Sequence, residues 1–163
     1  MKTSVVRSTL VLALLLFAVG SLPQVFAANG ASFQATGTLG PANTLLSPLS
    51  LTRVDVTIRF SPSTVSGAPG GTVSSTLTAD NKQTVAFTVT GCAIFIKAPG
   101  STKYVRSTCS VSSSFTIAAH GKATGTLSFG ISSTAPAGAY SVKFYLTNSA
   151  DESHAGLLTI DVT

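Results

Sequence analysis

The sequence predicts an all-β protein, an antiparallel sandwich of seven to eight strands. Apolar and polar residues alternate over most of the chain, and this places successive side chains on opposite faces of a strand. Short runs rich in Gly, Pro, Asp and Asn separate these stretches at the roughly 8–12-residue spacing that is typical of sandwiches. Only 9% of residues are charged while 44% are hydrophobic, which excludes a coiled coil and a disordered tail.

Residues 1–27 are typical of a secretory signal peptide. Lys2 and Arg7 form the basic start, residues 10–19 form a short apolar segment, and cleavage is expected after Ala27. An uncleaved anchor is the alternative, although a membrane span needs about 20 apolar residues. Beyond Ala27 the chain has eight basic and five acidic residues, too small an excess to indicate nucleic-acid binding. We expect a secreted protein, extracellular or at the cell surface, with no membrane span in the mature chain.

Residues 28–52 are expected to form an N-terminal strand and a linker. Apolar or small residues alternate with polar ones over 31–39, and those of one face are Ala31, Phe33, Ala35, Gly37 and Leu39. Residues 53–163 contain enough further strands for a complete sandwich, so the leading strand looks surplus to it. It could be donated to the sheet of a neighbouring subunit by β-strand addition. The alternative is an ordinary first strand of the same domain.

The remaining strands follow from alternation and from the turn residues between them. The pattern is clearest in residues 53–60, where Val54, Val56, Ile58 and Phe60 share one face. In residues 140–146 the side chains expected to point inward are those of Tyr140, Val142, Phe144 and Leu146. The predicted strands after the linker are 53–60, 72–79, 84–91, 93–97, 103–109, 113–118, 123–131, 140–146 and 158–162.

The two cysteines, Cys92 and Cys109, are expected to form a disulfide. An even number of cysteines in an oxidising compartment favours this, and two buried free thiols are the alternative. If the intervening turn centres on Gly100-Ser101, the cysteines lie opposite each other in a hairpin. The bridge would then clamp that hairpin.

Three segments resemble the bacterial and archaeal Ig-like, fibronectin-like domains of surface proteins and secreted hydrolases. They are residues 60–73, residues 121–127, and residues 133–142 with the terminal strand 157–162. The resemblance implies an Ig-like fold, in which the Tyr140 hydroxyl turns back to the backbone as in a tyrosine corner. The chain departs from antibody domains in two ways. It has no Trp, and its two cysteines are too close in sequence to form the inter-sheet disulfide of antibody domains.

The cysteine-containing hairpin is the second candidate site. The expected register places Phe95, Lys97, Tyr104 and Arg106 on one face, with Lys103 near the turn. Cations between aromatic rings can bind an acidic polysaccharide or a partner protein. The alternative is a solvated hairpin whose charges protect a sheet edge.

The sequence therefore favours an extracellular structural or adhesive protein, as a filament subunit that self-associates by strand donation. The second hypothesis is a non-catalytic module that binds a cell-surface glycan or a protein through the hairpin. No arrangement of titratable residues indicates catalysis, so we expect no enzyme, no cofactor and no metal.

Overall fold

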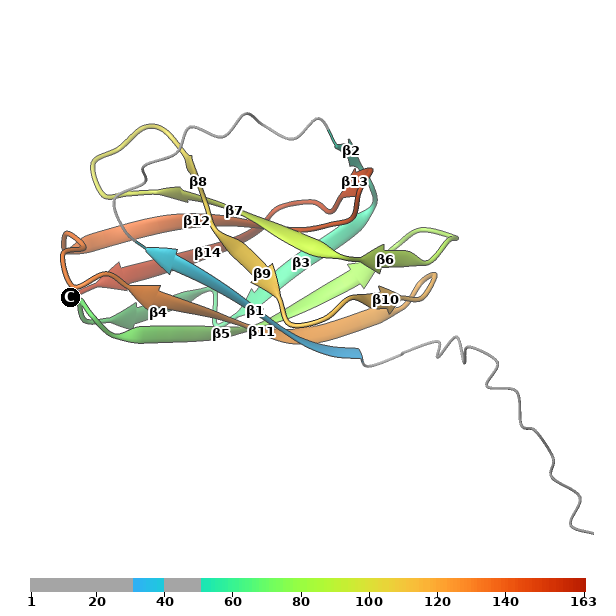
Figure 1. Cartoon of the computed structure of the whole chain (residues 1–163), viewed down its shortest axis with the longest axis horizontal. Coiled ribbons are helices and arrows are strands. Elements are labelled where there is room, and N and C mark those ends of the chain that lie inside the picture. Colours follow the sequence, from blue (N-terminus) through green and yellow to red (C-terminus); the bar gives the residue numbers. More distant parts are fainter. Residues whose placement is uncertain (1–30, 40–50) are drawn as a thin grey trace, which may run out of the picture.

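The computed structural model describes residues 31–39 and 51–163, and in these ranges it contains strands, turns and loops but no helix. Two large sheets face each other as a sandwich (Figure 1). The expectations for the signal peptide and for residues 40–50 lie outside the described residues.

The first sheet has five strands, and the N-terminal strand lies inside it. Its spatial order is β3 (Val56–Ser61), β5 (Thr72–Asn81), β11 (Lys122–Ile131), β1 (Ala31–Leu39) and β9 (Cys109–Val111). Along β5 and β11 buried residues alternate with exposed or half-buried ones, as expected for strands with one face in the core.

The second sheet has seven strands around a central β12 (Gly138–Thr147). One side of β12 pairs with β7 (Gly91–Lys97), which pairs with β8 (Val105–Ser107). The other side pairs with β14 (Gly156–Val162), which pairs with β4 (Thr64–Gly67). Two short strands, β13 (Asp151–Glu152) and β2 (Thr52–Arg53), extend one end. A separate pair joins β6 (Phe87–Val89) to β10 (Phe115–Ile117).

The core between the sheets is apolar and closely filled. Its largest fully buried side chains include Phe129 from the first sheet and Phe144 from the second. Phe60 packs edge-on against Phe144, with ring centroids 6.1 Å apart. Each such aromatic or aliphatic side chain stabilises the fold by roughly 1.5–3 kcal/mol through burial.

Most predicted strands are present, with four local differences. The segment 53–60 is divided between β2 and β3, because Val56 N–H bonds to the carbonyl of Val54 instead of to a neighbouring strand. Residues 84–91 give only the three-residue β6 and the start of β7, and residues 103–109 give β8 and the start of β9. The strand β4 covers residues 64–67, where no strand was predicted.

The expected sandwich was antiparallel, whereas three pairings are parallel: β1 with β11, β2 with β13 and β4 with β14. The partners in each pair are far apart in the sequence. No turn connects them directly, so no local residue pattern indicates them.

The predicted Tyr140 arrangement is confirmed. The Tyr140 side chain is buried, and its hydroxyl donates a hydrogen bond of 3.0 Å to the carbonyl of Pro136. Gly138 has φ +127°, which lets the chain turn from Pro136 into β12.

Candidate functional site

The N-terminal strand β1 occupies a position between two strands that do not otherwise meet. It pairs with β11 in parallel over its whole length, from Ala31 opposite Ala123 to Leu39 opposite Ile131. On its other side, Ala35, Thr36 and Gly37 pair antiparallel with β9. We call this position between β11 and β9 the β1 slot.

This position corrects the expectation of a surplus strand. Among the described strands of this sheet, β9 pairs only with β1. Removal of β1 would therefore leave backbone N–H and C=O groups of both β11 and β9 without partners. The expected complete sandwich in residues 53–163 is therefore missing an internal strand. Counting alternating segments could not reveal which strand is internal, because strand order is a tertiary property.

The predicted donor face of β1 points into the core. Phe33, Ala35 and Leu39 are 4%, 1% and 1% exposed, respectively. The Phe33 ring stacks on Phe115, with centroids 4.3 Å apart. Gly37 provides needed space, because a Cβ there would lie 2.7 Å from both Ile94 Cδ1 and a Phe129 ring carbon. These contacts fix the position of β1 against the core.

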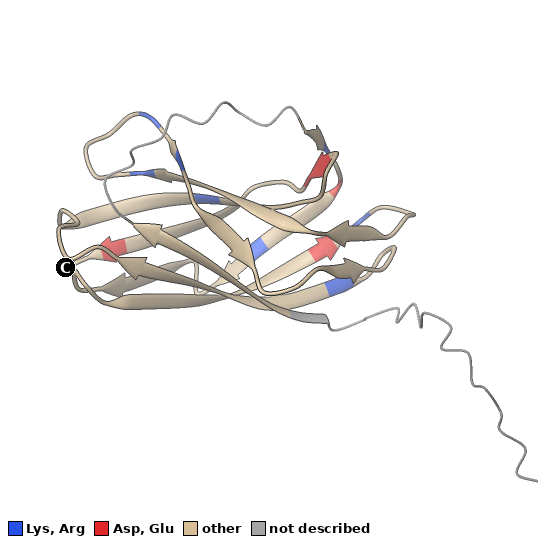
Figure 2. Ribbon diagram, in the orientation of Figure 1, with Lys and Arg blue, Asp and Glu red and all other residues tan. Residues whose placement is uncertain are grey.

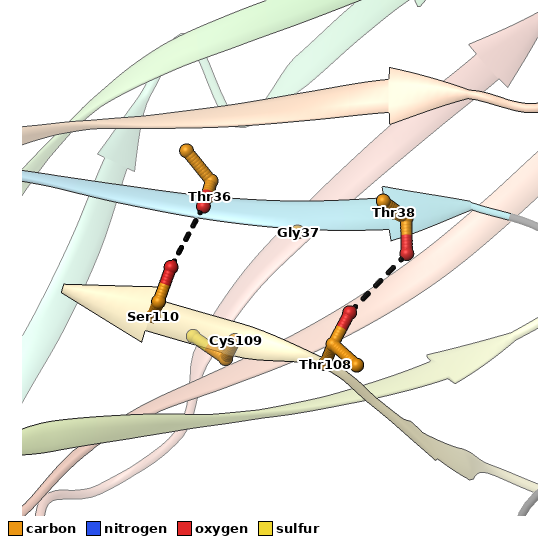
Figure 3. A pocket seen from close by; sticks show the side chains of 6 residues that line it. All are labelled: Thr36, Gly37, Thr38, Thr108, Cys109 and Ser110. Atoms are coloured by element: carbon orange, nitrogen blue, oxygen red, sulfur yellow. Dashed lines mark hydrogen bonds between the residues drawn. The ribbon is translucent and has the colours of Figure 1, made fainter.

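The seam between β1 and β9 is short and hydroxyl-rich. Thr36 Oγ1 bonds to Ser110 Oγ at 3.0 Å, and Thr38 Oγ1 lies 3.4 Å from Thr108 Oγ1 (Figure 3). Ser107 Oγ also donates to the carbonyl of Thr38. A shallow hollow of about 140 Å³ lies over this seam. Exposed hydroxyl contacts of this kind stabilise the seam only modestly.

The predicted disulfide between Cys92 and Cys109 is present, with Cα atoms 5.7 Å apart. Its expected role needs correction. The chain leaves the hairpin at Thr108, so Cys92 lies in β7 of the second sheet while Cys109 lies in β9 of the first. The bridge therefore joins the two sheets, and it also holds β9, the outer wall of the β1 slot, beside Gly37.

The predicted hairpin register is confirmed in β7 and β8. Ile94 lies opposite Ser107 and Phe95 opposite Arg106. Lys97 Nζ lies 5.7 Å from the centre of the Tyr104 ring, so these two predicted site residues are brought together. Lys103 is exposed in the loop between the strands.

Two further residues, Lys143 and Tyr145 of β12, complete this surface. Lys143 pairs with Phe95 across the strands, and its Nζ lies 4.3 Å from the Tyr104 ring centre. Tyr145 packs edge-on against Phe95, with centroids 5.8 Å apart. The alternation of 140–146 already points both side chains outward. The sequence gives no signal, however, that β12 lies beside β7.

The charges of this surface are concentrated and positive. Figure 2 shows Lys and Arg on β7, β8, their loop and β12, and no acidic residue on β7 or β8. Among the described residues, ion pairs involve Arg53, Lys82, Lys122 and His154 as the cationic partners. None of these pairs includes the four cations of the surface, which are Lys97, Lys103, Arg106 and Lys143. Burial, followed by the charge of Glu152, raises the pKa of the Tyr145 hydroxyl, so this ring stays neutral at physiological pH.

No protein-family model matches the chain, and no curated protein sequence matches it. Solved structures share parts of its fold at low identity. The sporulation control protein Spo0M of Bacillus subtilis is 14% identical with a TM-score of 0.47, and the match covers 67% of this chain and 49% of that one. A family 123 glycoside hydrolase from Clostridium perfringens is 9% identical with a TM-score of 0.46, and the match covers 67% of this chain and 27% of that one.

A chain of the CaDoc0917–CaCohA2 complex is 18% identical, with a TM-score of 0.38. That match covers 66% of this chain and 99% of the other. The chain spans half or less of the length of the Spo0M and glycoside hydrolase structures. At these identities and TM-scores the matches assign no activity to this chain.

Proposed function

We propose that the protein is a non-catalytic, extracellular structural subunit that assembles into filaments by donating β1. The observation that carries the proposal is the β1 slot. An N-terminal strand fills an internal gap between β11 and β9, and its buried side chains belong to the core.

The contacts of β1 do not depend on which copy supplies it. They are backbone pairs to β11 and β9 together with core packing by Phe33, Ala35 and Leu39. After the expected cleavage at Ala27, β1 is joined to the body only through residues 40–51. Twelve residues span at most about 40 Å when extended, which sets the upper limit on how far β1 can lie from the body of its own subunit. Head-to-tail donation that does not close on itself produces an open filament.

A cross-linking experiment tests this directly. Thr36 and Ser128 are opposite each other across β1 and β11, and neither is buried. In mature protein carrying Thr36→Cys and Ser128→Cys, a short bismaleimide reagent joins the two positions. Donation predicts a ladder of covalent multimers on a denaturing gel and filaments by electron microscopy. Monomers joined only within one chain would overturn the proposal, and covalent dimers alone would overturn its filament part.

Two controls make the ladder specific. A full-length mature chain that carries only Ser128→Cys has a single added thiol and should give no product beyond a dimer, which shows that the Cys92–Cys109 pair does not react. The second control pairs Thr36→Cys with Arg59→Cys, which is exposed on β3, two strands away from β11 in the same sheet. A ladder of equal yield from that pair would show random collision and count against strand donation.

A further inference from the structure

The outer surface of β8, β7 and β12 combines four cations with three aromatic rings. We call it the basic aromatic face; it consists of Phe95, Lys97, Lys103, Tyr104, Arg106, Lys143 and Tyr145. The pairings β8–β7 and β7–β12 set the spacing of Phe95, Lys97, Arg106, Lys143 and Tyr145, and the loop that enters β8 carries Lys103 and Tyr104. Groups that are already held in place lose less conformational entropy when a ligand binds.

The electrostatics of this face favour an anionic ligand. Lys97 and Lys143 both approach the Tyr104 ring, at 5.7 and 4.3 Å from its centre. The ring faces attract these cations, but they do not neutralise them. The neighbouring strands of this sheet also carry carboxylates: Glu152 of β13 is paired with Arg53, and half-buried Asp161 of β14 lies opposite Ala139, at the other end of β12 from Tyr145. An extended polyanion would offset the mutual repulsion of the four cations.

The aromatic rings favour a ligand whose negative charges are carried by sugar rings. Phe95, Tyr104 and Tyr145 are half-buried, so each of these residues keeps part of its surface accessible beside the cations. The apolar C–H face of a pyranose packs on such a ring, while its carboxylate or sulfate groups bind ammonium and guanidinium groups. Only a polymer that carries both features uses the whole face.

We infer that the basic aromatic face binds an acidic polysaccharide, a glycan with carboxylate or sulfate groups along its length. The face lies on the second sheet, whereas the β1 slot lies in the first, so the inference does not rest on strand donation. A filament with this property would hold such a polymer at every subunit.

Binding is measured by biolayer interferometry with immobilised polygalacturonate, dextran sulfate and neutral dextran. We expect binding to at least one acidic polymer, weakening as the salt concentration rises, and none to neutral dextran. The double variant Lys97→Ala/Lys143→Ala should bind about tenfold more weakly, since each exposed ion contact contributes up to about 1 kcal/mol. Absence of binding to both acidic polymers would overturn the inference.

A matched control separates recognition from net charge. Arg59→Ala/Lys122→Ala removes the same charge from exposed positions of the first sheet. We expect it to change affinity less than about twofold, because binding depends on the positions of the charges. An equal loss from both double variants would show unspecific attraction and overturn the site.

The Tyr104→Ala variant tests the sugar part without a change in charge. It should weaken binding to polygalacturonate but not to inorganic polyphosphate, which has no sugar ring. If polyphosphate binds as tightly as polygalacturonate and Tyr104→Ala affects neither, the face is a simple cation patch and sugar recognition is refuted. Each variant is first compared with the parent protein by thermal unfolding, so that loss of folding is recognised.

Discussion

At the scale of single residues, two glycines of β11 in very different surroundings show how β1 is positioned. A Cβ on Gly125 would lie 2.6 Å from the backbone oxygen of Phe33, while one on Gly130 would meet nothing within 4 Å. Gly125 lies directly opposite Phe33 in the β1–β11 pairing. Because a backbone oxygen in a paired strand cannot easily move, this glycine determines how closely β1 approaches.

We therefore expect Gly125→Ala to lower the free energy of unfolding by about 1–3 kcal/mol, as overpacking usually does. Gly130→Ala should change it by less than about 0.5 kcal/mol. Urea denaturation of the two variants measures the difference. Equal effects would mean that β1 is not seated against Gly125.

Tyr140 gives a second prediction, on pH dependence. Burial raises the pKa of its hydroxyl above the ordinary value of 10.0. The folded protein thus favours the neutral, hydrogen-bond-donating form, and the resulting stability is fully present below pH 10 and lost as pH rises through the raised pKa. Tyr140→Phe should cost about 1 kcal/mol at neutral pH, through loss of the bond to Pro136, and should weaken the alkaline decline. Thermal unfolding between pH 7 and 11 tests both effects, and an unchanged alkaline slope would contradict the assignment.

At the scale of elements, the disulfide and β9 act together. Cys109 pairs with Gly37 of β1, and the bridge ties it to β7 in the opposite sheet. β9 has only three residues, none of them fully buried, and its one pairing partner in the sheet is β1, so without β1 the bridge would be its covalent link to β7. We infer that the disulfide prepares the β1 slot to receive a strand.

Replacement of both cysteines by alanine should lower the free energy of unfolding by about 3 kcal/mol, the value for a loop of this length. It should also increase amide hydrogen exchange in β1 and β9 more than in β12 and β14. Hydrogen exchange followed by mass spectrometry resolves these strands. Uniform acceleration over all four would show that the bridge has no special effect on the slot.

At the scale of the whole molecule, strand donation has a kinetic consequence. To leave its slot, β1 must extract Phe33, Ala35 and Leu39 from the core and break its pairs with two strands. The barrier is then close to that of partial unfolding, so assembled material should persist after dilution.

We expect multimers separated by size-exclusion chromatography to remain multimers after hundredfold dilution, and to give monomers only after unfolding and refolding at low concentration. Multi-angle light scattering measures the masses. Rapid return to monomers on dilution would indicate a weak surface contact instead of an exchanged strand.

Much of this molecule follows from local pattern. The alternation over 31–39 and 140–146 and the register of Phe95 with Arg106 were predictable, because side chains two apart share a face and a turn aligns the residues on either side. The partners of the disulfide were predictable because the chain has only two cysteines. These features depend on residues close together in the chain.

The tertiary structure alone decided what depends on distant residues. It placed β1 parallel to β11, moved β9 to the opposite sheet from β8, and brought Lys143 and Tyr145 beside the hairpin. Strand order is set by the total burial of the core, to which every strand contributes, and no segment specifies its neighbours by itself. The sequence by itself thus determined the strands and their inward faces, whereas packing determined which strands are neighbours. The β1 slot and the basic aromatic face both result from those neighbour relations.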